Sequence, residues 1–249
     1  MSVGSRPGVS PPGHNSVVLE IHLVPMVQDV DVGGMGVRRV AVLAAVLVGL
    51  GLLTGPGTAG SPGHPQVRAL FFGDSLVAGT GATPPRPVQV RTAADRLGWE
   101  AVVDARGGTG YTTGGSKGRP YLDRLQHDGF LKLPYDVIVL EGGTNDAHHG
   151  TPAKVREAAL RAIDYVHRRQ PWARIVLVGA FAPQGQPLER YQEVDTALVQ
   201  VAAERGLRYV SQLHYSRLTD AGFLSRDRFH PGDAGYALMG RELAQALKG

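Results

Sequence analysis

From about residue 66 to the end of the chain, short apolar runs alternate with longer amphipathic segments. The apolar runs have the length and continuity of strands that are buried on both faces, and the segments between them are long enough for helices. The runs are Val67–Phe72, Ala101–Val103, Val137–Leu140, Ile175–Val178 and Leu207–Val210. This alternation predicts an α/β fold, a three-layer α/β/α sandwich around a mainly parallel sheet of about five strands, in a domain spanning residues 66–249.

Three helices are predicted most clearly. The first begins at Thr151-Pro152, with threonine as the cap and proline in the first turn. Its apolar residues recur about every 3.6 positions and predict one buried face: Val155, Ala159, Ile163 and Val166. Residues 187–204 and 233–248 show similar patterns, and the apolar stripe of the last helix is Tyr236, Met239, Leu243 and Leu247.

Both tryptophans, Trp99 and Trp172, lie at predicted junctions into strands. We therefore expect them to pack against the sheet rather than to serve as platforms for sugars.

The first 60 residues follow a different pattern. Residues 1–34 are rich in Gly, Pro, Ser and Val without a helical period, which predicts a disordered or wrongly assigned amino-terminal extension. In residues 35–60 an Arg-Arg pair precedes an apolar run of 14 residues, 40–53, and small residues follow. This order is typical of a secretory signal peptide and predicts a secreted or extracytoplasmic protein whose translation starts at Met26 or Met35 rather than at Met1.

The alternative for the same segment is an uncleaved membrane anchor through residues 40–53. A transmembrane helix needs about 20 apolar residues, so the run is short for that role. In this interpretation the membrane contacts the protein only through its amino-terminal segment.

Composition excludes several classes of protein. Cysteine is absent, which rules out disulfides, thiolate metal sites and a cysteine nucleophile. The net charge of +4 is small and scattered, and no basic run is interleaved with aromatic residues, so nucleic acid is not an expected partner. The sequence contains no internal repeat.

Chemically useful residues follow the predicted strands. Gly73-Asp74-Ser75 comes directly after the first run, glycines including Gly107 come after the second, and Asn145-Asp146 comes after the third. Asp227 and His230 precede the last helix. Because ligands of parallel sheets bind at the carboxyl ends of the strands, these residues are expected at one edge. Together they provide a nucleophile, a base, its orienting carboxylate and an oxyanion hole for acyl transfer.

Four short motifs, in this order, resemble those of the SGNH hydrolases, also called the GDSL family of esterases and lipases. They are GDSL (73–76), RGGTG (106–110), GTND (143–146) and DRFH (227–230). The resemblance spans essentially the whole predicted domain and implies the flavodoxin-like fold of that family. It also implies an esterase without metal or organic cofactor, which acts on a small-molecule ester or an acylated carbohydrate or lipid. We expect a monomer.

The resemblance implies a role for each motif residue. Ser75 is the expected nucleophile, His230 the general base, and Asp227 the carboxylate that orients the imidazole.

The expected oxyanion donors are the backbone N–H groups of Ser75 and Gly107 and the side-chain amide of Asn145. Asp74 and Asp146 are expected to support the turns around them.

Other interpretations of single motifs are weaker. Ser116 lies in a G-x-S-x-G sequence, but no strand precedes it directly, as a nucleophile elbow requires. The glycine-rich segments lack a P-loop lysine. His148 and His149 have no third ligand at metal spacing, so we interpret them as loop residues, at most at the rim of a pocket. A non-catalytic carbohydrate-binding module of the cell envelope remains the alternative function.

Overall fold

The computed structural model describes residues 26–28, 40–42, 66–217 and 222–248. The chain forms two compact units, Met1–Gly60 and Ser61–Gly249. In the first unit, β1 (Met26–Gln28) pairs antiparallel with β2 (Val40–Val42). The rest of the predicted extension and signal segment lies outside the described residues, so those predictions remain predictions. No helix in the described part of the chain is both long and apolar enough to cross a membrane.

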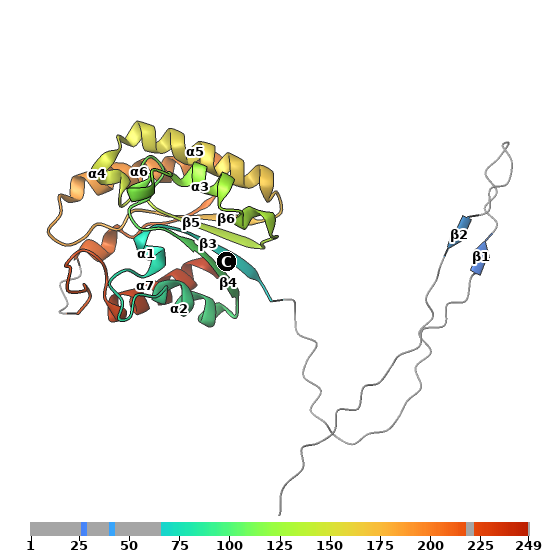
Figure 1. Cartoon of the computed structure of the whole chain (residues 1–249), viewed down its shortest axis with the longest axis horizontal. Helices are drawn as coiled ribbons and strands as arrows, with labels where there is room; N and C mark the ends of the chain where they lie inside the picture. Colours follow the sequence, from blue (N-terminus) through green and yellow to red (C-terminus); the bar gives the residue numbers. More distant parts are fainter. Residues whose placement is uncertain (1–25, 29–39, 43–65, 218–221, 249) are drawn as a thin grey trace, which may run out of the picture. The chain divides into compact units, whose positions relative to one another are not determined.

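The second unit contains a five-stranded parallel sheet, as predicted (Figure 1). Its strand order is β4-β3-β5-β6-β7, so the first strand of the domain lies between the second and the third. This is the flavodoxin-like order. The strands are β3 (Arg68–Gly73), β4 (Glu100–Ala105), β5 (Val137–Glu141), β6 (Arg174–Val178) and β7 (Arg208–Val210).

Helices cover both faces of the sheet and complete the predicted three layers. In Figure 1, α2 and α7 lie on one side, and α3, α5 and α6 lie on the other. The helices are α1 (Ser75–Ala78), α2 (Val88–Leu97), α3 (Tyr121–His127), α4 (Asp146–His149), α5 (Pro152–Arg169), α6 (Leu188–Arg205) and α7 (Asp233–Leu247). Short 3-10 turns are η1 (Gly115–Lys117), η2 (Phe130–Lys132) and η3 (Leu213–Arg217).

The continuous apolar character of the strands follows from this layering. Successive side chains of a strand point to opposite faces, so a sheet covered on both faces needs apolar residues at every position. In β3, Leu70 and Phe72 join the core under α5 and α6, whereas Ala69 and Phe71 join the core under α2 and α7.

The three predicted helices are confirmed. Thr151 caps α5, and its hydroxyl accepts a hydrogen bond from the Lys154 N–H at 3.4 Å. The apolar stripes predicted for α5 and α7 are buried.

The tryptophan prediction is half wrong. Trp99 is partly buried against the core under α2 and α7, but Trp172 is 95% exposed. The reason is local: β6 begins only at Arg174, so Trp172 lies in the turn before the strand and outside the packed layers.

Candidate active site

The nucleophile turn follows directly from β3. Asp74 caps α1, because its Oδ1 accepts a hydrogen bond from the Leu76 N–H at 2.8 Å, and Ser75 is the first residue of the helix. A Cβ atom at Gly73 would lie 2.5 Å from the Val77 side chain and 2.8 Å from the carbonyl oxygen of Glu141. Only glycine therefore lets the chain turn this closely against β5.

The structure brings Ser75, His230 and Asp227 together in one line of hydrogen bonds. His230 Nε2 lies 2.9 Å from Ser75 Oγ, and His230 Nδ1 lies 2.7 Å from Asp227 Oδ2. Ser75 follows β3, whereas the other two residues come from the loop before α7, and His230 lies 155 residues further along the chain than Ser75. This is the geometry of a nucleophile, a base and an orienting carboxylate.

Asp227 is kept ionised by its hydrogen-bond donors. Burial raises the pKa of its carboxyl group, but hydrogen bonds outweigh this effect and lower the pKa below the ordinary value. The donors are the His230 ring, the backbone N–H groups of Phe229 and His230, and the Ser225 hydroxyl. A charged Asp227 favours the histidine tautomer with its proton on Nδ1, which leaves Nε2 free to accept the serine proton.

Two backbone N–H groups at the nucleophile turn belong to the expected oxyanion donors Ser75 and Gly107. Among the described residues, no acceptor receives a hydrogen bond from the N–H of Ser75 or of Gly107. Gly107 lies against the nucleophile, because a Cβ atom there would be 3.7 Å from Ser75 Cβ, whereas one at Gly108 would face Gly115. Both donors are thus available close to the nucleophile, and their role as an oxyanion hole stays a prediction.

Asn145 is close to the site, but its amide is already engaged. Its Nδ2 donates to Asp74 Oδ2 at 3.0 Å and to the carbonyl oxygen of Thr109 at 2.9 Å. The two hydrogens of the amide thus have acceptors within the protein. The expected donation from Asn145 to an oxyanion therefore stays a prediction, and it requires one of these bonds to be shared or exchanged.

Three buried carboxyl groups lie beneath and beside the nucleophile turn. Burial raises the pKa of Asp74 to about 7 and that of Glu141, at the end of β5, to about 8. A second negative charge nearby disfavours ionisation, so Asp146 adds to the shift of Asp74, and Asp74 adds to the shift of Glu141. Burial also raises the pKa of Asp146, although several hydrogen bonds oppose the shift.

Asp146 holds the loop that follows the Gly107 turn. Its carboxylate accepts hydrogen bonds from the Tyr111 N–H at 3.0 Å, the Thr112 N–H at 2.7 Å and the Thr112 hydroxyl at 2.6 Å. Gly110 is packed so closely against this carboxylate that a Cβ atom there would overlap it. These contacts agree with the predicted supporting role.

Sequence reasoning missed Arg124, which is fully buried in α3. Its guanidinium donates to the carbonyl oxygens of Gly73 (2.7 Å) and Asp104 (3.1 Å), the Thr109 hydroxyl (2.8 Å) and the Asp104 carboxylate (2.6 Å). It therefore connects the ends of β3 and β4 to the loop that contains Gly107 and Thr109. The available signal was weak, because most arginines of amphipathic helices are exposed.

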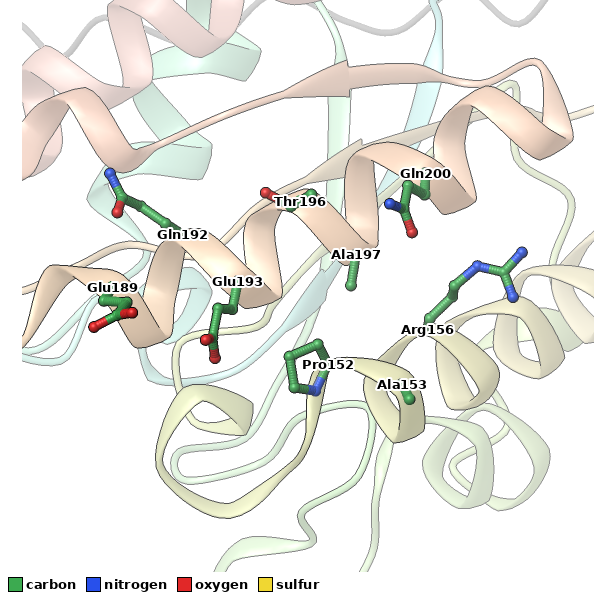
Figure 2. A pocket seen from close by; sticks show the side chains of 9 residues that line it. All are labelled: Pro152, Ala153, Arg156, Glu189, Gln192, Glu193, Thr196, Ala197 and Gln200. Carbon is green, nitrogen blue, oxygen red and sulfur yellow. The ribbon is translucent and has the colours of Figure 1, made fainter.

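A separate groove of about 700 Å³ lies between α5 and α6 and includes no residue of the Ser75–His230–Asp227 line (Figure 2). In the view, Glu193 extends from α6, and Arg156 extends from the facing helix α5. Across the described ranges, no three His, Asp or Glu side chains are grouped so that they could hold a metal ion. Ser116, the serine of the G-x-S-x-G sequence, is exposed in η1.

Comparisons with known proteins agree with this geometry. The model of the GDSL-like Lipase/Acylhydrolase family matches residues 71–238. A comparison with curated proteins found no match.

Solved structures share the fold. A family two carbohydrate esterase from Clostridium thermocellum, in complex with cellohexaose, is 21% identical with a TM-score of 0.62, covering 76% of this chain and 66% of that chain. The lipase Lip_vut3 from a goat rumen metagenome is 17% identical with a TM-score of 0.60, covering 74% and 99%. TesA is 20% identical with a TM-score of 0.60, covering 73% and 98%.

The family model covers more than half of the chain, and the esterase and lipase structures share its parallel sheet and flanking helices. The chain therefore belongs to the GDSL-like lipase/acylhydrolase family and is an ester hydrolase of the SGNH type.

Proposed function

We propose that the protein is a serine esterase that hydrolyses carboxylic esters through an acyl-enzyme on Ser75. The observation that carries this proposal is the line of hydrogen bonds from Asp227 through His230 to Ser75. It ends beside two backbone N–H groups that have no acceptor among the described residues.

In the first half of the proposed reaction, His230 Nε2 takes the proton of Ser75 Oγ while the oxygen attacks the ester carbonyl carbon. The carbonyl electrons move to the oxygen, and the N–H groups of Ser75 and Gly107 stabilise the resulting oxyanion. The intermediate collapses, the bond to the alcohol oxygen breaks, and this oxygen receives the proton from His230. Asp227 stabilises the positive imidazolium between the two proton transfers.

In the second half, water replaces the alcohol. His230 takes a proton from the water as it attacks the acyl carbon, and the proton then goes to Ser75 Oγ as the carboxylic acid leaves. Every step uses side chains and backbone groups of this chain, and the proposed reaction requires no cofactor.

The substrate class remains broad. A small-molecule ester, an acylated carbohydrate and an acylated lipid are all compatible with the proposal, and the similar folds include both a carbohydrate esterase and a lipase. We also propose export through residues 35–60, which amino-terminal sequencing of exported protein tests. Retention of residues 1–34 on that protein would contradict this.

A panel of p-nitrophenyl esters from acetyl to palmitoyl tests the activity and its chain-length preference. Ser75→Ala is expected to lose hydrolysis by a factor on the order of 10⁴ or more. Ser116→Ala is the matched control and is expected to retain it. A serine-directed phosphonate should label Ser75, and peptide mass spectrometry that finds the label on Ser116 would overturn the assignment. Binding of an ester without hydrolysis would favour the non-catalytic alternative.

A further inference from the structure

The short helix α4 is fixed against α6 by two neighbouring side chains. Arg190 donates hydrogen bonds to the carbonyl oxygens of Ala147 at 3.3 Å and of Gly150 at 3.2 Å. The hydroxyl group of Tyr191 lies 2.8 Å from Nε2 of His148, and the two rings meet edge to face. His148 is therefore exposed to solvent but held in one position.

Tyr191 also selects the tautomer of His148. Tyr191 is only 1% exposed, and its hydroxyl has no other hydrogen-bond partner among the described residues. The hydroxyl hydrogen is therefore satisfied only if it is donated to Nε2, which can accept it when the proton of the neutral ring is on Nδ1. Burial lowers the pKa of His148, as do His149 and Arg190 nearby, so the neutral ring is favoured.

The donor on Nδ1 is unused. In the part of the chain that the structure describes, no acceptor pairs with Nδ1 of His148. Tyr191 thus leaves an unpartnered N–H group on the ring of the exposed residue His148.

Two sets of contacts connect His148 to the hydrogen-bonded residues Ser75, His230 and Asp227. Along α4 it lies one turn after Asn145, whose amide bonds to the Asp74 carboxylate next to Ser75. From the other side, the ring of half-buried Phe229 has its centroid 5.0 Å from that of His230 and 6.2 Å from that of His148. The ring of Phe229 therefore contacts both the His230 ring and the His148 ring.

We propose that Phe229 and His148 form the subsite for the alcohol part of the ester, and that His148 Nδ1–H donates a hydrogen bond to a hydroxyl group of that alcohol. This inference rests on the proposed esterase function. In that reaction His230 delivers its proton to the leaving alcohol oxygen, so the alcohol must lie on the side of His230, where Phe229 comes next.

The chemistry of the two side chains indicates the class of alcohol. An aromatic ring offers an apolar face to C–H groups, and a neutral N–H beside it offers one directed hydrogen bond. A polyhydroxylated alcohol such as a sugar presents both features. A simple alkyl alcohol uses only the first.

The test compares two acetate esters of primary alcohols that share a six-membered ring. One is 6-O-acetyl methyl glucopyranoside, and the other is cyclohexylmethyl acetate, which lacks the hydroxyl groups. The quantity measured is the ratio of their kcat/KM values. In His148→Phe, which keeps a ring beside Phe229 but removes the donor, the ratio is expected to fall about three- to tenfold, the value of one neutral hydrogen bond.

Three further variants separate recognition from folding. Tyr191→Phe should lower the ratio in the same direction, because it frees the histidine tautomer. His148→Asn should restore part of it, because its amide nitrogen lies near the position of Nδ1. His149→Phe is the matched control and should leave the ratio unchanged.

The outcomes are distinguishable. Wild-type protein that hydrolyses neither these esters nor p-nitrophenyl acetate overturns the proposed function and, with it, this inference. Active wild-type protein whose ratio is the same in His148→Phe, or falls equally in His149→Phe, overturns the inference alone.

Discussion

Carboxylates on two sides of Ser75 experience opposite environments. Asp227, in the loop before α7, has a side chain that is 43% exposed, and its hydrogen bonds lower its pKa. Asp74 and Glu141, beneath the nucleophile turn, are fully buried, and burial raises their pKa values to about 7 and about 8. The carboxyl group of Asp227, which faces His230, is thus kept charged. The carboxyl groups of Asp74 and Glu141, which lie beneath the nucleophile turn, are costly to ionise.

The difference indicates separate tasks. An orienting carboxylate must stay negative while the imidazole becomes positive, so it needs several hydrogen-bond donors that lower its pKa. A supporting carboxylate needs only to satisfy nearby donors. Replacing each carboxylate by the amide of the same shape tests this distinction, because the substitution removes the charge and changes little else.

Asp227→Asn should have the largest effect on catalysis. An amide cannot stabilise the imidazolium as a carboxylate does, and it can favour the wrong tautomer of His230. We expect kcat for a p-nitrophenyl ester to fall on the order of 10³- to 10⁴-fold. The fold should persist, because the Asn oxygen can still accept the backbone N–H groups of the loop. Retention of more than about a tenth of the wild-type kcat would show that the histidine is oriented by another group.

Asp233→Asn is the control for this prediction. Asp233 is an exposed carboxylate that begins α7 and pairs with Arg86 at 3.1 Å. Its replacement should leave kcat within a factor of two.

Asp74→Asn should have an intermediate effect. Leu76 N–H and Asn145 Nδ2 each donate to one oxygen of Asp74, and asparagine offers one oxygen only. Flipping the Asn145 amide does not resolve the conflict, because its oxygen would then face the carbonyl oxygen of Thr109. We expect kcat to fall about tenfold, the value of about 1.4 kcal/mol, as the Asn145 side chain loses its anchor.

The measurement for Asp74→Asn is kcat per folded molecule, with the folded fraction taken from circular dichroism. Asp195→Asn is a matched control, since Asp195 is a buried carboxylate that accepts from the Tyr209 and Ser211 hydroxyls, away from the nucleophile turn. It should change stability without changing kcat. Equal losses of kcat per folded molecule in both variants would mean that the effect of Asp74 is not specific to the nucleophile turn.

Much of this architecture is predictable from sequence, for physical reasons. Continuous apolar runs can be buried only in a sheet that is covered on both faces, which indicates the parallel sheet and its layers. The carboxyl ends of such strands lie at the same edge of the sheet. This predicts that Ser75, Gly107 and Asn145, which follow three of the strands, lie close together.

Other features depend on packing that no local pattern reveals. Arg124 is buried because four acceptors converge on it from strand ends and a loop that are distant in sequence. The two acceptors of the Asn145 amide, and the contact of Tyr191 with His148, likewise appear only when separate segments are assembled. The sequence predicts that Trp172 is packed because it precedes a strand, but it is exposed. An apolar residue next to a strand in the sequence is therefore not necessarily packed against the sheet.

Glu141→Gln should have the smallest effect on activity but a clear effect on stability. The Glu141 oxygens accept hydrogen bonds from Gln89 Nε2 at 3.0 Å and Gln212 Nε2 at 3.1 Å. The amide oxygens of both glutamines are buried, and neither has a hydrogen-bond partner in the described part of the chain. A glutamine at position 141 can accept from one neighbour and donate to the oxygen of the other, after that neighbour's amide flips. The substituted cluster therefore keeps both contacts without a buried negative charge.

The pH dependence gives the sharpest measurement. Since folding raises the pKa of Glu141 from 4.5 to about 8, the folded state holds this proton more tightly than the unfolded state. The stabilisation is complete below about pH 4.5 and is lost as the pH rises to about 8, by at most about 1.4 kcal/mol per pH unit. Glu141→Gln carries no such proton, so its free energy of unfolding relative to wild type should rise steadily between pH 5 and pH 8, with hydrolysis unchanged. A difference in stability that does not vary with pH would mean that Glu141 is already ionised in the folded protein, and the contrast with Asp227 would then rest on Asp74 alone.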